Sequence, residues 1–164
     1  MEKFQSSFIK SGNGKGITTF YNAQKIKPED QVNRERYQIG KFRNKNIDII
    51  NIYRSQAGHP VELLEDLMKM IRVGKITLVT GDFNACFREN FNNRLIQGLL
   101  SLGFNQLVHE ATHIKGRHID HAYLLDPTGK VHPIIERYSP YYSDHDGICI
   151  VIQNLEHEVK DGKQ

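Results

Sequence analysis

The stretch from residue 47 to residue 84 constrains the fold more than any other part of the chain. Residues 47–53 (IDIINIY) are apolar enough to form a strand that is covered on both faces. Residues 60–74 have apolar positions at helical spacing, with Pro60 in the first turn and Gly74 as the stop; these positions are Leu64, Leu67, Met68 and Ile71. Residues 75–80 (KITLVT) form a second compact strand pattern, so this stretch predicts strand, helix and strand in succession.

The remaining patterns add strands and one more helix. A second helix is expected with Asn90 as its cap, with Leu95, Ile96 and Leu99 on one face, and with its end near Gly103. Further strands are expected at 16–21, 36–42, 104–108, 119–125, 131–138 and 147–153. Because both helices lie between strands, the pattern predicts a mixed α/β layered structure rather than an all-β sandwich or a helix bundle.

Length and composition limit the class of protein. The 164 residues fit one domain, and 38% hydrophobic with 25% charged residues is typical of a soluble globular protein rather than a disordered one. There is no apolar run long enough for a membrane span and no signal peptide at the start, so we expect no membrane partner and a nuclear or cytoplasmic location. We expect one domain over residues 1–154 and a charged, flexible tail over 155–164.

The charge is uneven along the chain. Residues 1–54 hold 11 lysines and arginines against 5 acids, whereas the whole chain has a net charge of only +3. This basic first third could lie along a polyanion, or it could be ordinary solubilising surface charge. The two cysteines, Cys86 and Cys149, are too few for a disulfide framework, so we expect reduced thiols, with Cys149 in a core strand.

Three polar clusters stand at the ends of strand-like runs. They are residues 81–84 (GDFN), 118–121 (HIDH) and 143–145 (SDH). A fold that gathers strand ends at one rim of a sheet would bring them together. They supply carboxylates, a carboxamide and an imidazole, the groups that hold a divalent cation and direct water at a phosphodiester.

Each cluster has a chemical role to offer. Asp82 could act as a base or orient water, and Asn84, on the same side of an extended chain, could hold that water or a phosphate oxygen. Protonated His145 could contact phosphate, with Asp120 as its orienting partner, while Asp144 faces a cation. The alternative for a lone Gly-Asp-Phe-Asn or Ser-Asp is an ordinary turn, and the joint occurrence of three clusters favours the functional interpretation.

The ordered motifs resemble a known family. They are Ile52-Tyr53-Arg54, Leu78 to Asn84, Thr112-His113, Arg117 to His121 and Ser143 to Gly147. This order resembles the endonuclease/exonuclease/phosphatase superfamily, which includes AP endonucleases, DNase I and the endonuclease domains of LINE-type retrotransposons. The resemblance implies a DNase I-like four-layered α/β sandwich, a hydrolase that cleaves phosphodiesters with Mg²⁺ or Mn²⁺, and DNA as its partner.

The resemblance also implies a role for each matched residue. Asp82 resembles the water-activating aspartate, Asn84 the asparagine that holds water or the phosphorane, and Asp144 a metal ligand. Asp120 and His145 resemble the carboxylate and histidine pair. Tyr53 stands where relatives have a phosphate-contacting tyrosine, although a core aromatic ending a strand is the alternative. We expect Thr112, Ser143 and Arg54 on the substrate side, and the short polar Thr112 and Ser143 most resemble the retrotransposon branch.

One part of the family pattern is not recognised. Relatives begin with a strand ending in Asn or Asp, a helix, and a second strand whose Gln-Glu motif carries a principal metal ligand. Here residues 11–21 resemble the hairpin that follows this section, so we expect an N-terminally truncated domain without those strands and that helix. Glu2, Glu29 and Glu35 do not stand at a convincing strand end.

Three functions from different classes therefore remain open. The first is an active metal-dependent DNA endonuclease of retrotransposon type. The second is a catalytically impaired remnant of such a domain, whose uncovered sheet would be covered by a partner chain or by self-association. The third is an unrelated zinc protein with His109, His113, His118 and His121 as ligands.

Overall fold

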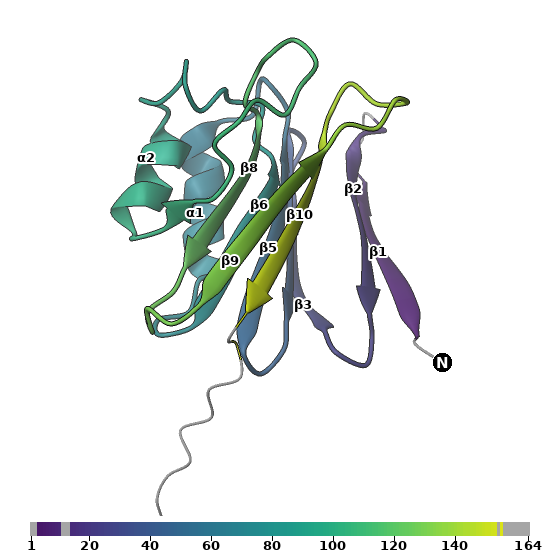
Figure 1. The fold of residues 1–164 in the computed structure, drawn as a ribbon, viewed down its shortest axis with the longest axis vertical. Coiled ribbons are helices and arrows are strands. Elements are labelled where there is room, and N and C mark those ends of the chain that lie inside the picture. The colour runs from purple at the N-terminus through teal and green to yellow at the C-terminus, as the bar shows by residue number, and fades with distance from the viewer. Residues whose placement is uncertain (1–2, 11–13, 154, 156–164) are drawn as a thin grey trace, which may run out of the picture.

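The computed structural model describes residues 3–10, 14–153 and 155 (Figure 1). Within these residues the element order is β1 (Phe4–Lys10), β2 (Gly16–Asn22), β3 (Lys27–Asn33), β4 (Tyr37–Arg43), β5 (Ile47–Arg54), α1 (Pro60–Met70), β6 (Ile76–Asp82), α2 (Arg94–Ser101), β7 (Asn105–Gln106), β8 (Asp120–Leu125), β9 (His132–Tyr138) and β10 (Gly147–Gln153). The mixed α/β architecture expected from the sequence is confirmed.

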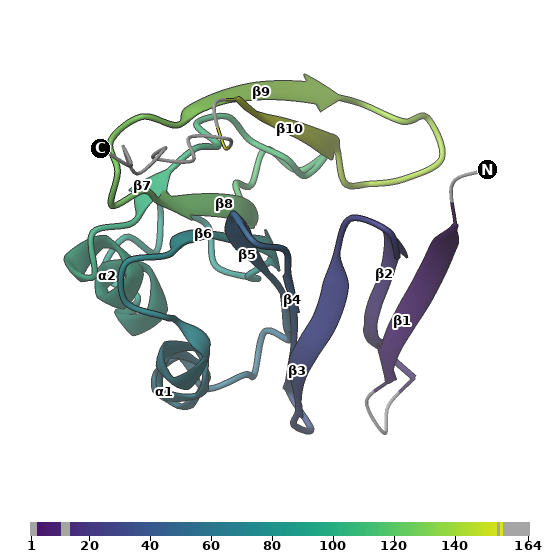
Figure 2. The same ribbon diagram turned by 90° about the horizontal axis from the view of Figure 1, so that it is seen from below.

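A six-stranded sheet forms the centre, in the order β3-β4-β5-β6-β8-β7. β5 and β6 are parallel and are joined through α1, while the other neighbours are antiparallel. Figure 2 shows α1 and α2 on one face of this sheet and the β9–β10 hairpin on the other, with the β1–β2 hairpin at the side of β3 and β4. The described residues thus supply three layers of the expected four-layered sandwich.

The central strands are buried on both faces because their side chains alternate. In β5, Ile50 and Ile52 belong to the core under the helices, whereas Ile47 and Ile49 belong to the core under β9 and β10. Ile50 and Ile52 are fully buried. The strand predicted at residues 47–53 is therefore present and covered on both faces. Its end lies beside the end of β6, because Tyr53 pairs with Asp82.

Of the four apolar positions expected on the inner face of α1, Leu64, Leu67 and Ile71 pack in or against the core, and only Met68 does not. Leu63, Leu67 and Met70 face the core, while Met68 is 48% exposed. The burial of Asp66 was not expected, because aspartate is usually a surface residue. Its carboxylate is in fact buried, where it accepts a hydrogen bond from the Tyr37 hydroxyl at 2.8 Å.

Several other helices and strands also differ from the expected ones. β1 and β3 were not expected, and the strand expected at 104–108 is reduced to β7. Asn93 rather than Asn90 caps α2, its side chain accepting from the Leu95 N–H.

Both thiols are free, but Cys149 is exposed because it lies on the outward face of β10. Apart from Leu155, the predicted tail lies outside the described residues. Neither described helix is long and apolar enough to cross a membrane.

Candidate active site

The sheet register places two carboxylates side by side. Asp82 ends β6 and Asp120 begins β8, and these residues are direct partners in the antiparallel ladder. On the other side of β6, Asp82 pairs with Tyr53 at the end of β5. Gly81 permits this close pairing, because its φ is +140° and a Cβ there would lie 1.9 Å from the Ile52 carbonyl oxygen.

The third cluster joins through a hydrogen bond. The Nδ1 of His145 lies 2.8 Å from the Asp120 Oδ2. One ligand atom each of Asp82, Asp120 and His145 lies within 4.8 Å of the others. The three polar clusters therefore meet at one rim of the sheet, as their positions at strand ends predict.

The electrostatics of this rim differ from those of free side chains. Burial raises the pKa of Asp82 to about 6, and the neighbouring charge of Asp120 adds to the rise, although the Asn84 N–H opposes it. Burial lowers the pKa of His145, but the hydrogen bond to Asp120 and the nearby acids outweigh this and raise it overall. Asp82 can thus exchange a proton near neutral pH beside an imidazole that favours its charged form.

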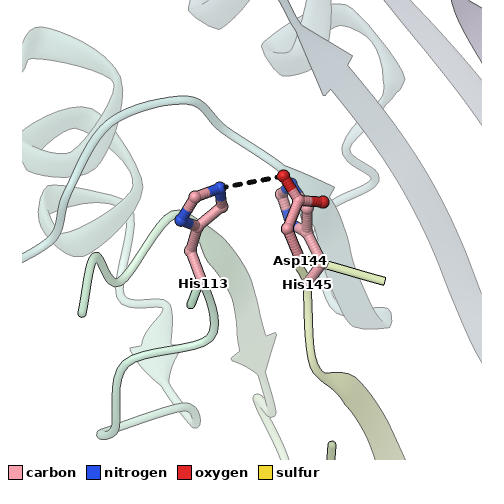
Figure 3. Close-up of side chains that lie close together, drawn as sticks. All are labelled: His113, Asp144 and His145. Atoms are coloured by element: carbon pink, nitrogen blue, oxygen red, sulfur yellow. Dashed lines mark ion pairs between the residues drawn. The ribbon is translucent and has the colours of Figure 1, made fainter. Parts of the chain in front are cut away.

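Asp144 lies at the solvent side of the cluster. Its side chain is 66% exposed, and its Oδ2 is 3.4 Å from the Nε2 of His113 (Figure 3). The Lys115 N–H donates to the Nδ1 of His113 at 3.1 Å, so the proton of a neutral His113 ring sits on Nε2, toward Asp144. The ring of His113 also meets the ring of His145 edge-on at 5.0 Å between centroids.

The backbone holds these two segments together. His113 and His145 form an isolated antiparallel bridge, and the Ile114 N–H donates to the Asp144 carbonyl at 2.8 Å. The Asp146 N–H donates to the Thr112 carbonyl at 2.7 Å. Sequence reasoning named His113 only as a zinc ligand and missed this contact with Asp144 and His145. Its place beside Thr112 in the motif was the one available signal.

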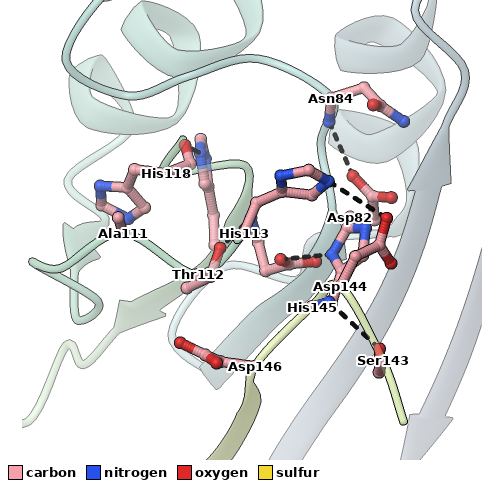
Figure 4. Close-up of polar contacts among 12 residues, drawn as sticks. Asp82, Asn84, Ala111, Thr112, His113, His118, Ser143, Asp144, His145 and Asp146 are labelled. Atoms are coloured by element: carbon pink, nitrogen blue, oxygen red, sulfur yellow. Dashed lines mark hydrogen bonds and ion pairs between the residues drawn. The ribbon is translucent and has the colours of Figure 1, made fainter. Parts of the chain in front are cut away.

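Asn84 corrects one expectation. Its φ is +46°, so it does not follow Asp82 on an extended chain as predicted. The chain turns there, and the Asn84 N–H donates to the Asp82 Oδ1 at 2.9 Å, as Figure 4 shows. The side-chain amide of Asn84 donates to the Arg54 carbonyl at 2.6 Å. The two residues remain neighbours, but through a turn.

Arg54 hydrogen-bonds to the backbone in this structure and is not exposed for a substrate contact. Its side chain is buried, and its guanidinium donates to the carbonyls of Gly58, Phe83 and Asn84 at 2.5, 2.7 and 3.2 Å. It therefore ties the end of β5 to the turn that carries Asp82 and Asn84.

The other expected substrate-side residues also contact the protein. Thr112 is fully buried, and its hydroxyl accepts from the Asp120 N–H at 3.1 Å. The Ser143 hydroxyl accepts from the His145 N–H at 3.1 Å. Tyr53 is half-buried at the end of β5, next to Asp82. Thr112 and Ser143 thus fix the backbone of the Asp120 and His145 pair.

The four histidines of the zinc hypothesis do not form one cluster, although the ring centroids of His118 and His121 lie 5.1 Å apart. No metal-capable group in the described part of the chain contains His109, His118 or His121. His121 is fully buried between the Tyr123 hydroxyl and the His118 carbonyl, and burial lowers its pKa to about 4. This arrangement is typical of core histidines and gives no support to a zinc site.

The donor set near Asp144 is compatible with a hard divalent cation. Mg²⁺ usually takes one or two carboxylates, with water and substrate oxygens completing its shell. The exposed carboxylate of Asp144 and the carboxylate of Asp82, both around His145, offer such oxygens.

The fold matches those of solved members of the endonuclease/exonuclease/phosphatase superfamily, the family that the motifs resemble. The endonuclease domain of TRAS1, a telomere-specific non-LTR retrotransposon, matches with a TM-score of 0.68 at 14% identity, over 94% of this chain and 80% of that one. An AP endonuclease from Archaeoglobus fulgidus matches with a TM-score of 0.66 at 16% identity, over 92% and 80%. A mannosyl-6-phosphatase from Bacteroides thetaiotaomicron gives 0.60 at 14%, over 91% and 76%. No family model and no curated protein matches the sequence.

Proposed function

We propose that this chain is a divalent-metal-dependent phosphodiester hydrolase, and that its substrate is DNA, which it cleaves as an endonuclease of the retrotransposon type. The observation that carries the proposal is the meeting of Asp82, Asp120 and His145 within 4.8 Å at one rim. A structural match to a retrotransposon endonuclease domain and to an AP endonuclease supports the choice of DNA.

Each residue has a defined task in this reaction. Asp82, with a pKa near 6, accepts a proton from the attacking water. Asp120 holds the Nδ1–H of His145, which leaves the Nε2 of the charged ring to donate to a non-bridging phosphate oxygen. Asn84 fixes the Asp82 carboxylate through its N–H, and Tyr53 stands next to it for a phosphate contact. Asp144 would hold Mg²⁺ or Mn²⁺, which when bound neutralises charge on the phosphate.

A nicking assay tests the proposal. Supercoiled plasmid is incubated with the chain and Mg²⁺ or Mn²⁺, alongside Asp82→Ala and His145→Ala. We expect the parent protein to nick the plasmid and each variant to lose at least about 100-fold, since both groups act on the reacting atoms. Asp30→Ala, an exposed aspartate of β3, is the matched control and should keep full activity. Equal nicking by all four proteins would point to a contaminant.

One observation favours a second candidate, a catalytically impaired domain of the same fold. Neither metal-capable group in the described part of the chain includes a glutamate, and the family resemblance implies one as a principal ligand. An impaired domain would leave the plasmid intact in both metals while the folded protein keeps a cooperative unfolding transition. It would then serve through its fold or a binding surface.

A further inference from the structure

A hollow lined by lysine and arginine side chains lies at the end of the sheet opposite Asp82. We call it the basic groove, and its cations are Lys25, Lys27, Arg43, Lys45, Arg72 and Lys75. Three amides complete the lining, and among the described residues that line it there is no aspartate or glutamate. Five of the six cations are exposed and Arg72 is half-buried. The groove is therefore a concentration of positive charge that reaches solvent.

Three separate connections build the groove. The β2–β3 turn and the start of β3 give Lys25 and Lys27. The end of β4 and the β4–β5 turn give Arg43 and Lys45, and the loop from α1 to β6 gives Arg72 and Lys75. In Figure 1 the β2–β3 and β4–β5 turns lie at the lower end of the sheets. Cations from three connections that are distant in sequence converge on one surface.

The backbone beneath these cations is held in place. The Asn22 side chain accepts from the Gln24 N–H at 2.9 Å, which fixes the β2–β3 turn. The Asn44 side chain accepts from the Asn46 and Ile47 N–H groups at 2.8 and 2.9 Å, which fixes the β4–β5 turn. The groove is thus a preformed surface, so an anion that binds there does not have to order the turns.

The described acids beneath the groove, Glu29 and Asp48, are fewer than the cations around them. Arg43 pairs with Glu29 at 3.0 Å and Arg72 pairs with Asp48, but both acids also pair with buried Lys41. Among the described residues, these two carboxylates stand against Lys41, Arg43 and Arg72, and Lys27 and Lys75 add two more cations to the groove lining. Positively charged side chains in excess of carboxylates repel one another and attract polyanions.

We propose that the basic groove binds the phosphate backbone of nucleic acid as a second contact, separate from the candidate active site. The choice of nucleic acid as the polyanion rests on the proposed function, whereas the groove itself does not depend on Asp82 chemistry. Lys75 and Asp82 flank the two ends of the seven-residue strand β6, so the two sites are roughly 20 Å apart at about 3.3 Å per residue.

Binding of fluorescent DNA to the full chain in EDTA tests the groove without any turnover. The groove variant carries Lys27→Gln, Arg43→Gln and Lys75→Gln. The matched control carries Lys3→Gln, Lys10→Gln and Lys130→Gln, three exposed lysines that do not line the groove. Affinity is measured by anisotropy between about 50 and 200 mM salt, and thermal unfolding checks that both variants keep the stability of the parent.

We expect the groove variant to bind at least about tenfold more weakly, and the slope of log affinity against log salt to flatten by roughly 2 to 3, since each lost phosphate contact removes about 0.9 for duplex DNA. The control should change less than about twofold. An equal loss in both variants, unchanged binding in the groove variant, or no DNA binding by the parent would overturn the proposal. Stronger competition by polyglutamate than by DNA would reassign the groove to an acidic protein.

The outcome is independent of the nicking assay. A parent protein that never nicks but binds DNA through the groove refutes the proposed hydrolysis and keeps the groove. A parent protein that nicks normally with the groove variant unaffected in affinity keeps the hydrolysis and refutes the groove.

Discussion

Asp82 is a carboxylate held where its ionised form is unfavourable. Its pKa of about 6 lies above the ordinary aspartate value near 4 because the side chain is buried beside Asp120. The folded chain therefore binds the Asp82 proton more tightly than the unfolded chain does. Stability falls as the pH rises from about 4 to about 6 and is then constant, so at neutral pH this residue destabilises the fold that carries it.

Replacement of Asp82 by asparagine should remove this loss. The amide oxygen can still accept from the Asn84 N–H, and the side chain no longer ionises. We expect the stability of Asp82→Asn relative to the parent to increase by about 1 to 3 kcal/mol between pH 4 and pH 7. Denaturant unfolding in EDTA across this pH range measures the difference.

Asp30→Asn controls for the loss of a carboxylate as such. Asp30 is exposed on β3, and its replacement should change stability by less than about 0.5 kcal/mol throughout the range. If the difference in the free energy of unfolding between Asp82→Asn and the parent does not vary with pH, the pKa of Asp82 is not raised in the folded chain.

Among single residues, the sequence predicted the site best where a carboxylate or imidazole side chain stands at the end of a predicted strand. Asp82, Asp120 and His145 could be named because each follows or precedes an apolar run, and the fold does gather them. The contact of His113 with Asp144 could not be named, because it depends on an antiparallel bridge between two loops far apart in the chain. The left-handed turn at Asn84 was hidden because Gly-Asp-Phe-Asn fits an extended strand end equally well.

The pairing of β5 with β6 depends on a single glycine. A Cβ at Gly81 would lie 1.9 Å from the Ile52 carbonyl oxygen, which is backbone and cannot move aside, and the φ of +140° is unfavourable for other residues. Gly81→Ala should therefore push the strands apart and cost at least about 3 kcal/mol. Chemical denaturation measures the loss, and absence of a cooperative transition is the limiting case.

Gly74→Ala separates the cost of a positive φ from the cost of a steric clash at Cβ. Gly74 also has a positive φ, +75°, but nothing lies within 4 Å of a Cβ built there. Its replacement should cost only about 1 to 2 kcal/mol, the price of a left-handed residue. Equal losses in the two variants would mean that the close approach of the strands contributes nothing.

At the level of elements, periodicity predicted the central strands and both helices, because burial on both faces leaves a strong apolar pattern. It missed β3 (KPEDQVN), whose residues are almost all exposed and which lies at the edge of the described sheet. On α1 it placed Leu64, Leu67 and Ile71 correctly against the core but not Met68. It also missed the burial of Asp66, which is held by Tyr37, Arg34 and Lys69 and which no helical pattern reveals.

Over the whole molecule, the two hairpins outside the central sheet determine what the surface presents. The inward side chains of β10, Ile148, Ile150 and Ile152, pack on the core beneath it. The β1–β2 hairpin is anchored in the same way, with Ile9 and Ile17 buried and Tyr21 packed on Phe42. This arrangement could not be predicted from the sequence, because β1 gave no recognisable pattern and the layer that each hairpin joins is set by tertiary packing.

The outward face of the β1–β2 hairpin is aromatic. Phe4 and Phe8 alternate along β1, and Phe20 pairs with Ser6 between them, so the three rings share one face. Phe8 and Phe20 are 58% and 76% exposed. Exposed aromatic rings gathered on a two-stranded hairpin favour contact with another apolar surface, so we expect the chain to self-associate through this face.

The double variant Phe8→Ser and Phe20→Ser should weaken this self-association at least about tenfold, because each buried Phe contributes roughly 1.5 to 3 kcal/mol. Sedimentation velocity over a concentration series measures it. Tyr141→Ser with Tyr142→Ser removes two exposed aromatic rings from the β9–β10 connection and should leave association unchanged. A parent protein that stays monomeric at every concentration would contradict the prediction, and equal weakening in both double variants would show that exposed aromatic area, rather than this hairpin, controls the association.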